Sequence, residues 1–378
     1  MLLEDLHKQL HEGKQTDLIL LDFSKAFDKV NHEKLLYKLH QYGVRDQNLR
    51  WIQAFLGKRS QTVVVEGDES EPAPVTSGVP QGSVLGPILF LAYINDLPDH
   101  VRSKVRLFAD DTALYLTLNT LSESRILQKD LSNLESWEKQ WDMEFNPGKC
   151  QVIQISRSRS PIPSHYLLHG QVLGVVDHAK YLGVTLSSDL KWNHHVDQVV
   201  NKANRTLGLI KRNIKVKHPK IRSTCYKALV RPQLEYSAAA WDPHTKDLTD
   251  RLEMVQRRAA RWTLNNYSHA ASVTSMLDQL GWETLEQRRS CARLALFHKI
   301  VYCHVAVPLP PYIIHPPRTT RHSHSLSFIQ IPTTKDHYKY SFFPLAIVQW
   351  NLLPENIVRM TKPHAFKAAL SSMTHTRP

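Results

Sequence analysis

The chain has 378 residues, with 48 Lys and Arg against 35 Asp and Glu, which gives a net charge of +13. We find no secretory signal and no apolar run long enough to cross a bilayer, so we expect no membrane partner and an intracellular location, in the nucleus or the cytoplasm. The four cysteines form no CxxC pair, which argues against a zinc ribbon or a disulfide framework.

The charge is spread unevenly along the chain. Residues 1–190 hold 20 basic and 24 acidic side chains, a balance of −4, whereas residues 191–378 hold 28 and 11, a balance of +17. A mildly acidic part joined to a strongly basic part suits a protein that holds cations in one half and a polyanion in the other. The alternative is that the basic half serves only solubility or localisation.

The first strand that we predict covers residues 17–23, DLILLDF, with Asp22 near its end. A continuous run of Ile and Leu is typical of a strand buried on both faces. Asp22 therefore leaves the sheet at its edge, where a carboxylate can face a cleft. The alternative is that Asp22 caps the following helix, which is predicted to begin near Asn31 or His32.

A loop rich in glycine and proline, SGVPQGSVLGP, covers residues 77–87. It follows a predicted helix over 47–56 and a strand over 61–66, and a helix over 85–94 continues from it. Its glycines allow a partner to approach the backbone closely, and Gln81 is at its apex. An ordinary connecting loop is the alternative.

Residues 105–116, VRLFADDTALYL, predict a β-hairpin with Asp110 and Asp111 at its tip. Two carboxylates about 4 Å apart repel by roughly 1 kcal/mol in water and about 4 kcal/mol at an effective dielectric constant of ~20. A solvated acidic turn is the simplest interpretation. If Asp22 lies beside this tip, however, the three carboxylates form the oxygen-ligand site that Mg²⁺ prefers.

The second half predicts amphipathic helices over residues 195–214, 221–234, 248–264 and 280–302. The third carries Arg257, Arg258 and Arg261, and the fourth carries Arg288, Arg289 and Arg293. Such clusters suit a surface that grips phosphates without reading base sequence, and they suit a solvated helical bundle almost as well. From residue 304 on, prolines, histidines and serines indicate a linker or a partly disordered segment, before an apolar stretch over 340–353 and a final helix near 365–373.

Five segments of the first half occur in an order that identifies a family. They are LDFSKAFDKVNH, SGVPQGSVLGPILFLAYINDLP, LFADDTALY, WDMEFNPGKCQVIQI and KYLGVTL. Together they resemble the palm of reverse transcriptases from non-LTR (LINE-type) retrotransposons, over residues 17–192. The resemblance implies an α+β fold, a right-hand polymerase palm whose antiparallel sheet is backed by helices, followed by an all-α thumb and an irregular C-terminal region. We expect the palm in residues 1–190, a basic, helical, thumb-like domain in 191–303 and a Pro/His-rich linker with a small C-terminal segment in 304–378.

The resemblance also implies the catalytic roles. Asp22 and Asp110 would hold two Mg²⁺ ions, with Mn²⁺ as an alternative, and Asp111 would support them. The backbone carbonyl of Phe23 would be a further metal ligand. Lys149 would neutralise or protonate the pyrophosphate, and a surface lysine is the alternative interpretation.

The remaining roles concern the nucleotide and the nucleic acid. Phe27 would lie under the sugar of the incoming nucleotide, unless it is only a core residue, and Gln81 with Gly82 would line the nucleotide pocket. The primer grip would be the hairpin with Tyr181, Leu182 and Gly183. Arg257, Arg258 and Arg261 would contact the nucleic-acid backbone.

The function that the resemblance implies is RNA-directed DNA synthesis, with an RNA template, a DNA primer and deoxynucleoside triphosphates as partners. Neither the finger motifs nor an endonuclease is recognised, so we expect a truncated form that acts alone or with its missing parts supplied in trans, if it is active. The main alternative is a catalytically inactive remnant that only binds nucleic acid. A nucleotide cyclase with a similar palm is a distant third.

Overall fold

The computed structural model describes residues 1–318 and 324–375 and divides the chain into two compact units. The first, here called the sheet unit, is Gly13–Leu182. The second, the helical unit, combines Met1–Glu12 with Gly183–Pro378. This division differs from the expected one, because the N-terminal helix belongs with the second half and because 191–303 and 304–378 form one unit.

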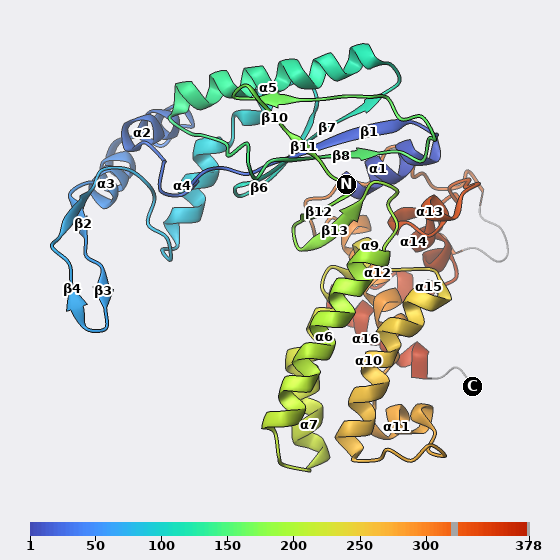
Figure 1. Cartoon of the computed structure of the whole chain (residues 1–378). Helices are drawn as coiled ribbons and strands as arrows, with labels where there is room; N and C mark the ends of the chain where they lie inside the picture. Colours follow the sequence, from blue (N-terminus) through green and yellow to red (C-terminus); the bar gives the residue numbers. More distant parts are fainter. Residues whose placement is uncertain (319–323, 376–378) are drawn as a thin grey trace. The chain divides into compact units, whose positions relative to one another are not determined.

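The sheet unit is built on five strands in the order β11-β8-β1-β7-β6 (Figure 1). The strands are β1 (Gln15–Leu21), β6 (Lys104–Phe108), β7 (Asp111–Leu118), β8 (Gln151–Ile155) and β11 (Gly174–Val175). The central strand β1 is almost wholly buried and pairs antiparallel with β7 and β8, as its continuous apolar sequence predicts. Only β11 departs from the expected antiparallel arrangement, because it pairs parallel with β8.

Helices cover this sheet and complete its core. They are α2 (His32–Gln41), α3 (Asp46–Leu56), α4 (Leu85–Ile94), the 3₁₀ turn η1 (Leu97–His100) and α5 (Leu121–Trp141). Short two-stranded pieces accompany them, namely β2 (Arg59–Gln61) with β5 (Ala73–Val75), β3 (Val64–Val65) with β4 (Asp68–Glu69), and β9 (Leu167–Leu168) with β10 (Gln171–Val172). The apolar core joins residues of β1 to α2, α4 and α5.

The longest helix of this unit, α5, was not predicted. Thr120 and Glu123 form a reciprocal capping box at its start, and Leu127, Leu131 and Leu134 are buried at helical spacing. Figure 1 shows α5 running along the sheet, and it contacts β7. The Thr-x-x-Glu sequence before periodic leucines is the signal that identifies this helix.

The hairpin expected at KYLGVTL is present. Strands β12 (His178–Tyr181) and β13 (Val184–Ser187) pair around a two-residue turn of Leu182 and Gly183, whose φ angles are 47° and 81°. Positive φ at both central positions is the turn geometry that matches the twist of paired strands. The chain passes from the sheet unit to the helical unit within this turn.

The helical unit begins with α1 (Leu2–His11) and continues after the hairpin. Its next elements are α6 (Asn193–Asn213), α7 (Pro219–Cys225), a π turn over Tyr226–Val230, α8 (Arg231–Glu235), α9 (Ala238–Trp241), α10 (Lys246–Leu264), α11 (Val273–Leu280) and α12 (Leu285–Val301). Figure 1 shows α6 and α10 side by side, and they contact each other. Within the described part of the chain, none of the helices has the length and apolarity to span a membrane.

The region after residue 303 is packed where the structure describes it. It contains α13 (Asp336–Lys339), α14 (Phe342–Asn351), α15 (Glu355–Val358) and α16 (Pro363–His375). Its apolar residues form one core with α12, in which Phe297, Trp350 and Phe366 are fully buried. The apolar stretch expected over 340–353 and the final helix expected near 365–373 correspond to α14 and α16. In the stretch expected to be a linker, Ile313 and Phe328 are buried in the same core, and residues 319–323 lie outside the described part.

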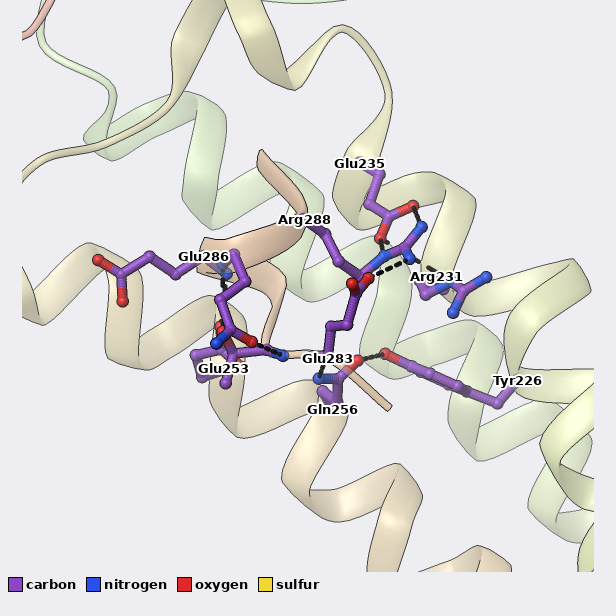
Figure 2. Close-up of polar contacts among 10 residues, drawn as sticks. Tyr226, Arg231, Glu235, Glu253, Gln256, Glu283, Glu286 and Arg288 are labelled. Carbon is purple, nitrogen blue, oxygen red and sulfur yellow. Dashed lines mark hydrogen bonds and ion pairs between the residues drawn. The ribbon is translucent and has the colours of Figure 1, made fainter. Parts of the chain in front are cut away.

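The arginines of α12 are ion-paired inside the unit rather than available to phosphates. The side chains of Arg289 and Arg293 are 1% and 2% exposed, and both bind Asp242. Arg288 binds Glu235 and Glu283, as Figure 2 shows. Of the two interpretations left open for these three residues, the phosphate grip is therefore wrong, because all three are ion-paired within the unit.

Candidate active site

Strand register places the three acidic residues at one edge of the sheet unit. The last pair of the β6–β7 hairpin is Phe108 with Asp111, so Ala109 and Asp110 form its two-residue turn. Leu21, the last residue of β1, pairs with Thr112 of β7, so the next residue, Asp22, follows on beside Asp111. Ala109 has a φ of 51°, a left-handed conformation that is costly for alanine and typical of tight hairpin turns.

The three carboxylates act on one another electrostatically. Burial raises the pKa of Asp111, and the charges of Asp110 and Asp22 raise it further. The Lys149 Nζ lies 3.2 Å from Asp22 Oδ2 and supplies a positive charge at this edge. Of the residues predicted to be catalytic, the structure thus brings Asp22, Asp110, Asp111 and Lys149 together.

The backbone around Asp22 is fixed by the segment that follows α5. The Asn146 N–H donates to the Asp22 carbonyl at 2.8 Å, and the Ser24 N–H donates to the Glu144 carbonyl at 2.8 Å. Neither bond uses the Phe23 carbonyl, and the Phe23 ring stacks on Phe145 with centroids 4.2 Å apart. Asp22 is therefore held by backbone pairing at the end of the central strand.

Asp22 is not the cap of the next helix. The N-cap of α2 is Asn31, whose side-chain oxygen accepts a hydrogen bond from the Lys34 N–H at 3.2 Å. The alternative that the sequence left open for Asp22 is thereby excluded.

The glycine-rich loop is tied to the turn that carries Phe27. The Val79 N–H donates to the Phe27 carbonyl at 2.8 Å, and Gln81 Nε2 donates to Asp28 Oδ1 at 3.1 Å. Gly78 has a φ of 86°, and a Cβ there would lie 2.9 Å from the Asp28 Cα, so only glycine fits. The loop is a built part of this site rather than a plain connector.

The nucleotide residues predicted from the sequence therefore lie close together. The Phe27 ring is half-buried and stacks on Phe90 with centroids 4.6 Å apart, so it is partly a core residue as well. Gln81 and Gly82 are exposed. Sequence reasoning missed Asp28, which orients Gln81; its only signal was a second aspartate in LDFSKAFD.

Strand β12 of the predicted primer-grip hairpin, which belongs to the sheet unit, lies next to the acidic edge. Burial raises the pKa of the half-buried Tyr181, and the negative charge of Asp111 raises it further. Within the sheet unit, Tyr181 thus feels the field of the same carboxylates.

The predicted phosphate contacts lie on the helical unit. Arg257 and Arg258 are exposed on α10, and Arg261 donates to the Ser268 carbonyl at 2.9 Å. Arg258 Nη1 donates to Asn204 Oδ1 of α6 at 3.2 Å. A shallow hollow runs along α6 and is lined by Asn201, Asn204, Arg205, Thr206, Gly208, Leu209 and Arg212.

The acidic edge has one feature that fits a divalent cation. Asp22 Oδ2 is a buried atom that accepts no hydrogen bond of good geometry among the described residues, and its nearest positive charge is the Lys149 ammonium at 3.2 Å. A buried carboxylate oxygen of this kind is costly unless a cation or a donor satisfies it. Residues 1–318 and 324–375 contain no group of three or more His, Cys, Asp or Glu side chains already gathered as a metal site. The carboxylates therefore share an electrostatic field without forming a finished coordination shell.

Comparison with known proteins agrees with the motifs. Residues 2–186 match the family "Reverse transcriptase (RNA-dependent DNA polymerase)". The chain is 28% identical over 294 residues to "Probable RNA-directed DNA polymerase from transposon BS" and 29% identical over 254 residues to "RNA-directed DNA polymerase from mobile element jockey", both of Drosophila melanogaster. These alignments cover 72% and 64% of this chain but 31% and 27% of the relatives, so the chain spans about three tenths of their length.

Among solved structures, the apo telomerase of Candida tropicalis is similar over 79% of this chain and 48% of that one, with a TM-score of 0.43 and 10% identity. The family match covers the whole acidic edge, the glycine-rich loop and the hairpin up to β13. The chain therefore carries a reverse transcriptase domain of the non-LTR, LINE-type retrotransposon group.

Proposed function

We propose that this chain is the RNA-directed DNA polymerase part of a non-LTR retrotransposon protein, which adds deoxynucleotides to the 3′-hydroxyl of a DNA primer on an RNA template. The observation that supports it most is the edge of the sheet unit, where Asp22, Asp110 and Asp111 share one electrostatic field beside Lys149. Paired carboxylates at a strand end are what two-metal nucleotidyl transfer needs.

Divalent cations, Mg²⁺ or Mn²⁺, would be held by the carboxylates of Asp22 and Asp110, supported by Asp111 and the Phe23 carbonyl. The pKa of Asp111 is raised by burial and then by the charges of Asp110 and Asp22, so a cation bound beside these carboxylates would lower the cost of keeping them ionised. When bound, the ions lower the pKa of the attacking hydroxyl and neutralise charge on the triphosphate.

The side chains of the chain supply position and charge. Lys149, held 3.2 Å from Asp22, would offer a positive charge or a proton to the departing pyrophosphate. The Phe27 ring, fixed by its stacking on Phe90, would limit the space below the sugar, and Gln81, oriented by Asp28, would contact the incoming nucleotide.

The helical unit would act as the thumb. Its exposed Arg257 and Arg258 on α10, with Arg205 and Arg212 beside the hollow along α6, offer positive charge without a pattern for reading bases. Such a surface binds the phosphate backbone of any sequence.

Primer extension tests this proposal. The purified chain is given a DNA primer on an RNA template, deoxynucleotides and Mg²⁺, beside an Asp110→Asn variant. Because the substitution removes a metal ligand and adds no bulk, we expect extension to fall by about 10³-fold or more while RNA binding stays the same. Extension that survives in the variant would contradict the metal assignment. RNA binding with no extension by either chain would favour the inactive remnant.

A further inference from the structure

The turn of the β12–β13 hairpin rests against an aromatic ring of the helical unit. Gly183 has a φ of 81°, and a Cβ built on it would lie 2.9 Å from Cε1 of Tyr236 and 3.5 Å from its Cζ and hydroxyl oxygen. The ring therefore lies directly against the backbone of the turn, and a side chain at residue 183 would require the ring to move.

Tyr236 is held at this position by its own backbone. Its N–H donates to the Pro232 carbonyl at 2.9 Å, and its carbonyl accepts a hydrogen bond at 2.8 Å from the indole Nε1 of Trp241, which is fully buried. Ser237 follows in a left-handed conformation with a φ of 53°, which turns the chain away from α8. The ring is 60% exposed, so burial of the side chain does not explain why the backbone is fixed so firmly.

The residue before Tyr236 is clamped as well. Glu235 receives two hydrogen bonds from Arg288 of α12, through Nε and through Nη2, the second at 3.1 Å. Arg288 also binds Glu283 at 3.1 Å, and Arg231 lies 3.8 Å from Glu235. Figure 2 shows this network joining the end of α8 to α12. An Arg–carboxylate pair with two hydrogen bonds fixes the relative orientation of the two side chains as well as their distance. The Arg288–Glu235 pair therefore holds the C-terminal end of α8, and with it the backbone of the next residue, Tyr236.

The strand before this turn lies against the sheet that carries the catalytic edge. Tyr181, the last residue of β12, is adjacent to Leu182, and β12 contacts β8, the strand that pairs with β1. A shift of the turn would therefore move a primer end that the hairpin holds against that edge.

We propose that Tyr236 is a positioning residue for DNA synthesis: its ring, anchored by the Arg288–Glu235 pair, fixes the Leu182–Gly183 turn so that the hairpin presents the primer end to the catalytic carboxylates. This inference rests on the proposed polymerase function. It assigns Tyr236 no contact with the reacting atoms; the residue acts through the backbone of the turn.

Single-turnover primer extension on the full chain separates positioning from simple loss of folding. A misfolded fraction lowers the amplitude of the first addition, whereas a misplaced primer end lowers its rate. For Tyr236→Ala we expect a rate that is about 10- to 100-fold lower, because small misplacements at a reacting centre cost that much. We expect primer–template affinity to change by less than about twofold, because the backbone contacts that supply most of it are retained.

Two control variants sharpen the test. Tyr236→Phe keeps the ring against Gly183, so we expect it to restore the wild-type rate within about threefold. Tyr267→Ala removes another exposed tyrosine of the same unit, 56% exposed, and should leave rate and amplitude unchanged. An alanine variant with a normal rate, or one that loses only amplitude, would overturn the proposal.

If the wild-type chain does not extend primers, the polymerase proposal is overturned. A second measurement, which does not depend on extension, then tests the role of Tyr236. Hydrogen–deuterium exchange of residues 178–187 is compared between the wild type and Tyr236→Ala. Faster exchange confined to this hairpin supports Tyr236 as the support of the turn. Unchanged exchange there contradicts it.

Discussion

At the scale of single residues, glycines mark where the chain has no room for a side chain. Gly78 and Gly82 lie in the same loop with φ angles of 86° and 81°. A Cβ on Gly78 would collide with the Asp28 and Phe27 backbone at 2.9–3.0 Å, whereas a Cβ on Gly82 meets nothing within 4 Å. An alanine at Gly82 would therefore suffer only backbone strain, whereas an alanine at Gly78 would suffer backbone strain and a steric clash.

We expect both Gly78→Ala and Gly82→Ala to lose about 1–2 kcal/mol of unfolding free energy, because each forces alanine into a left-handed conformation. Gly78→Ala should lose roughly 1–3 kcal/mol more, because its methyl group displaces the Phe27–Asp28 turn. Urea denaturation of the two variants measures this. Equal losses would show that the loop does not pack on that turn.

At the scale of elements, a buried lysine joins α2 to α4 and α5. Lys38 is 3% exposed; its Nζ donates to the Tyr93 carbonyl at 2.5 Å and to Asp96 at 2.6 Å, and lies 3.6 Å from the Trp141 ring centroid. Burial lowers the pKa of Lys38 to about 8, although Asp96 opposes the shift. The folded state thus releases this proton at a lower pH than the unfolded chain does.

Stability should therefore rise with pH above about 8, because the unfolded chain binds more protons than the folded one in that range. The shift from 10.5 to about 8 corresponds to a limit of ~3 kcal/mol, reached only near pH 10.5. Urea denaturation at pH 8 and pH 9.5 should show a gain in the wild type that is smaller in Lys38→Met. The same pH dependence in both chains would contradict this account of Lys38.

The predictable elements were those with a local signal. The apolar run of β1, the acidic hairpin and the glycine-rich loop each carry their structure in neighbouring residues, and all three are present, with β1 and the hairpin turn shifted by one or two residues from the prediction. The pairing of Arg289 and Arg293 with Asp242 depends on residues about fifty positions apart, so arginine content alone predicted an exposed surface wrongly. The apolar stretch over 340–353 and the final helix were predicted, but not the core that they form with α12, because its members lie far apart in the chain.

At the scale of the whole molecule, the positive charge is concentrated in residues 191–378. The three arginines of α12 are ion-paired within the unit. Arg257 and Arg258 of α10 are exposed and are therefore the residues with which to test phosphate binding. Their exposure on one helix predicts binding that is independent of base sequence and sensitive to salt.

Replacing Arg257 and Arg258 together by alanine should weaken RNA binding for every sequence. The slope of log affinity against log salt should fall by about 1.4 for single-stranded RNA, since each lost phosphate contact contributes roughly 0.7. Arg359→Ala serves as the control, because Arg359 is exposed but paired with Glu355 in the same unit. An unchanged slope in the double variant would remove α10 from the binding surface.

If Asp22, Asp110 and Asp111 hold a divalent cation, as proposed, its binding can be measured directly. Bound Mn²⁺ is counted by electron paramagnetic resonance on the full chain with primer–template and a non-extendable primer end. We expect tight Mn²⁺ binding in the wild type and its loss in both Asp22→Asn and Asp110→Asn, with Asp250→Asn on α10 as an acidic control that retains it. Tight binding that persists in the two site variants would contradict the account.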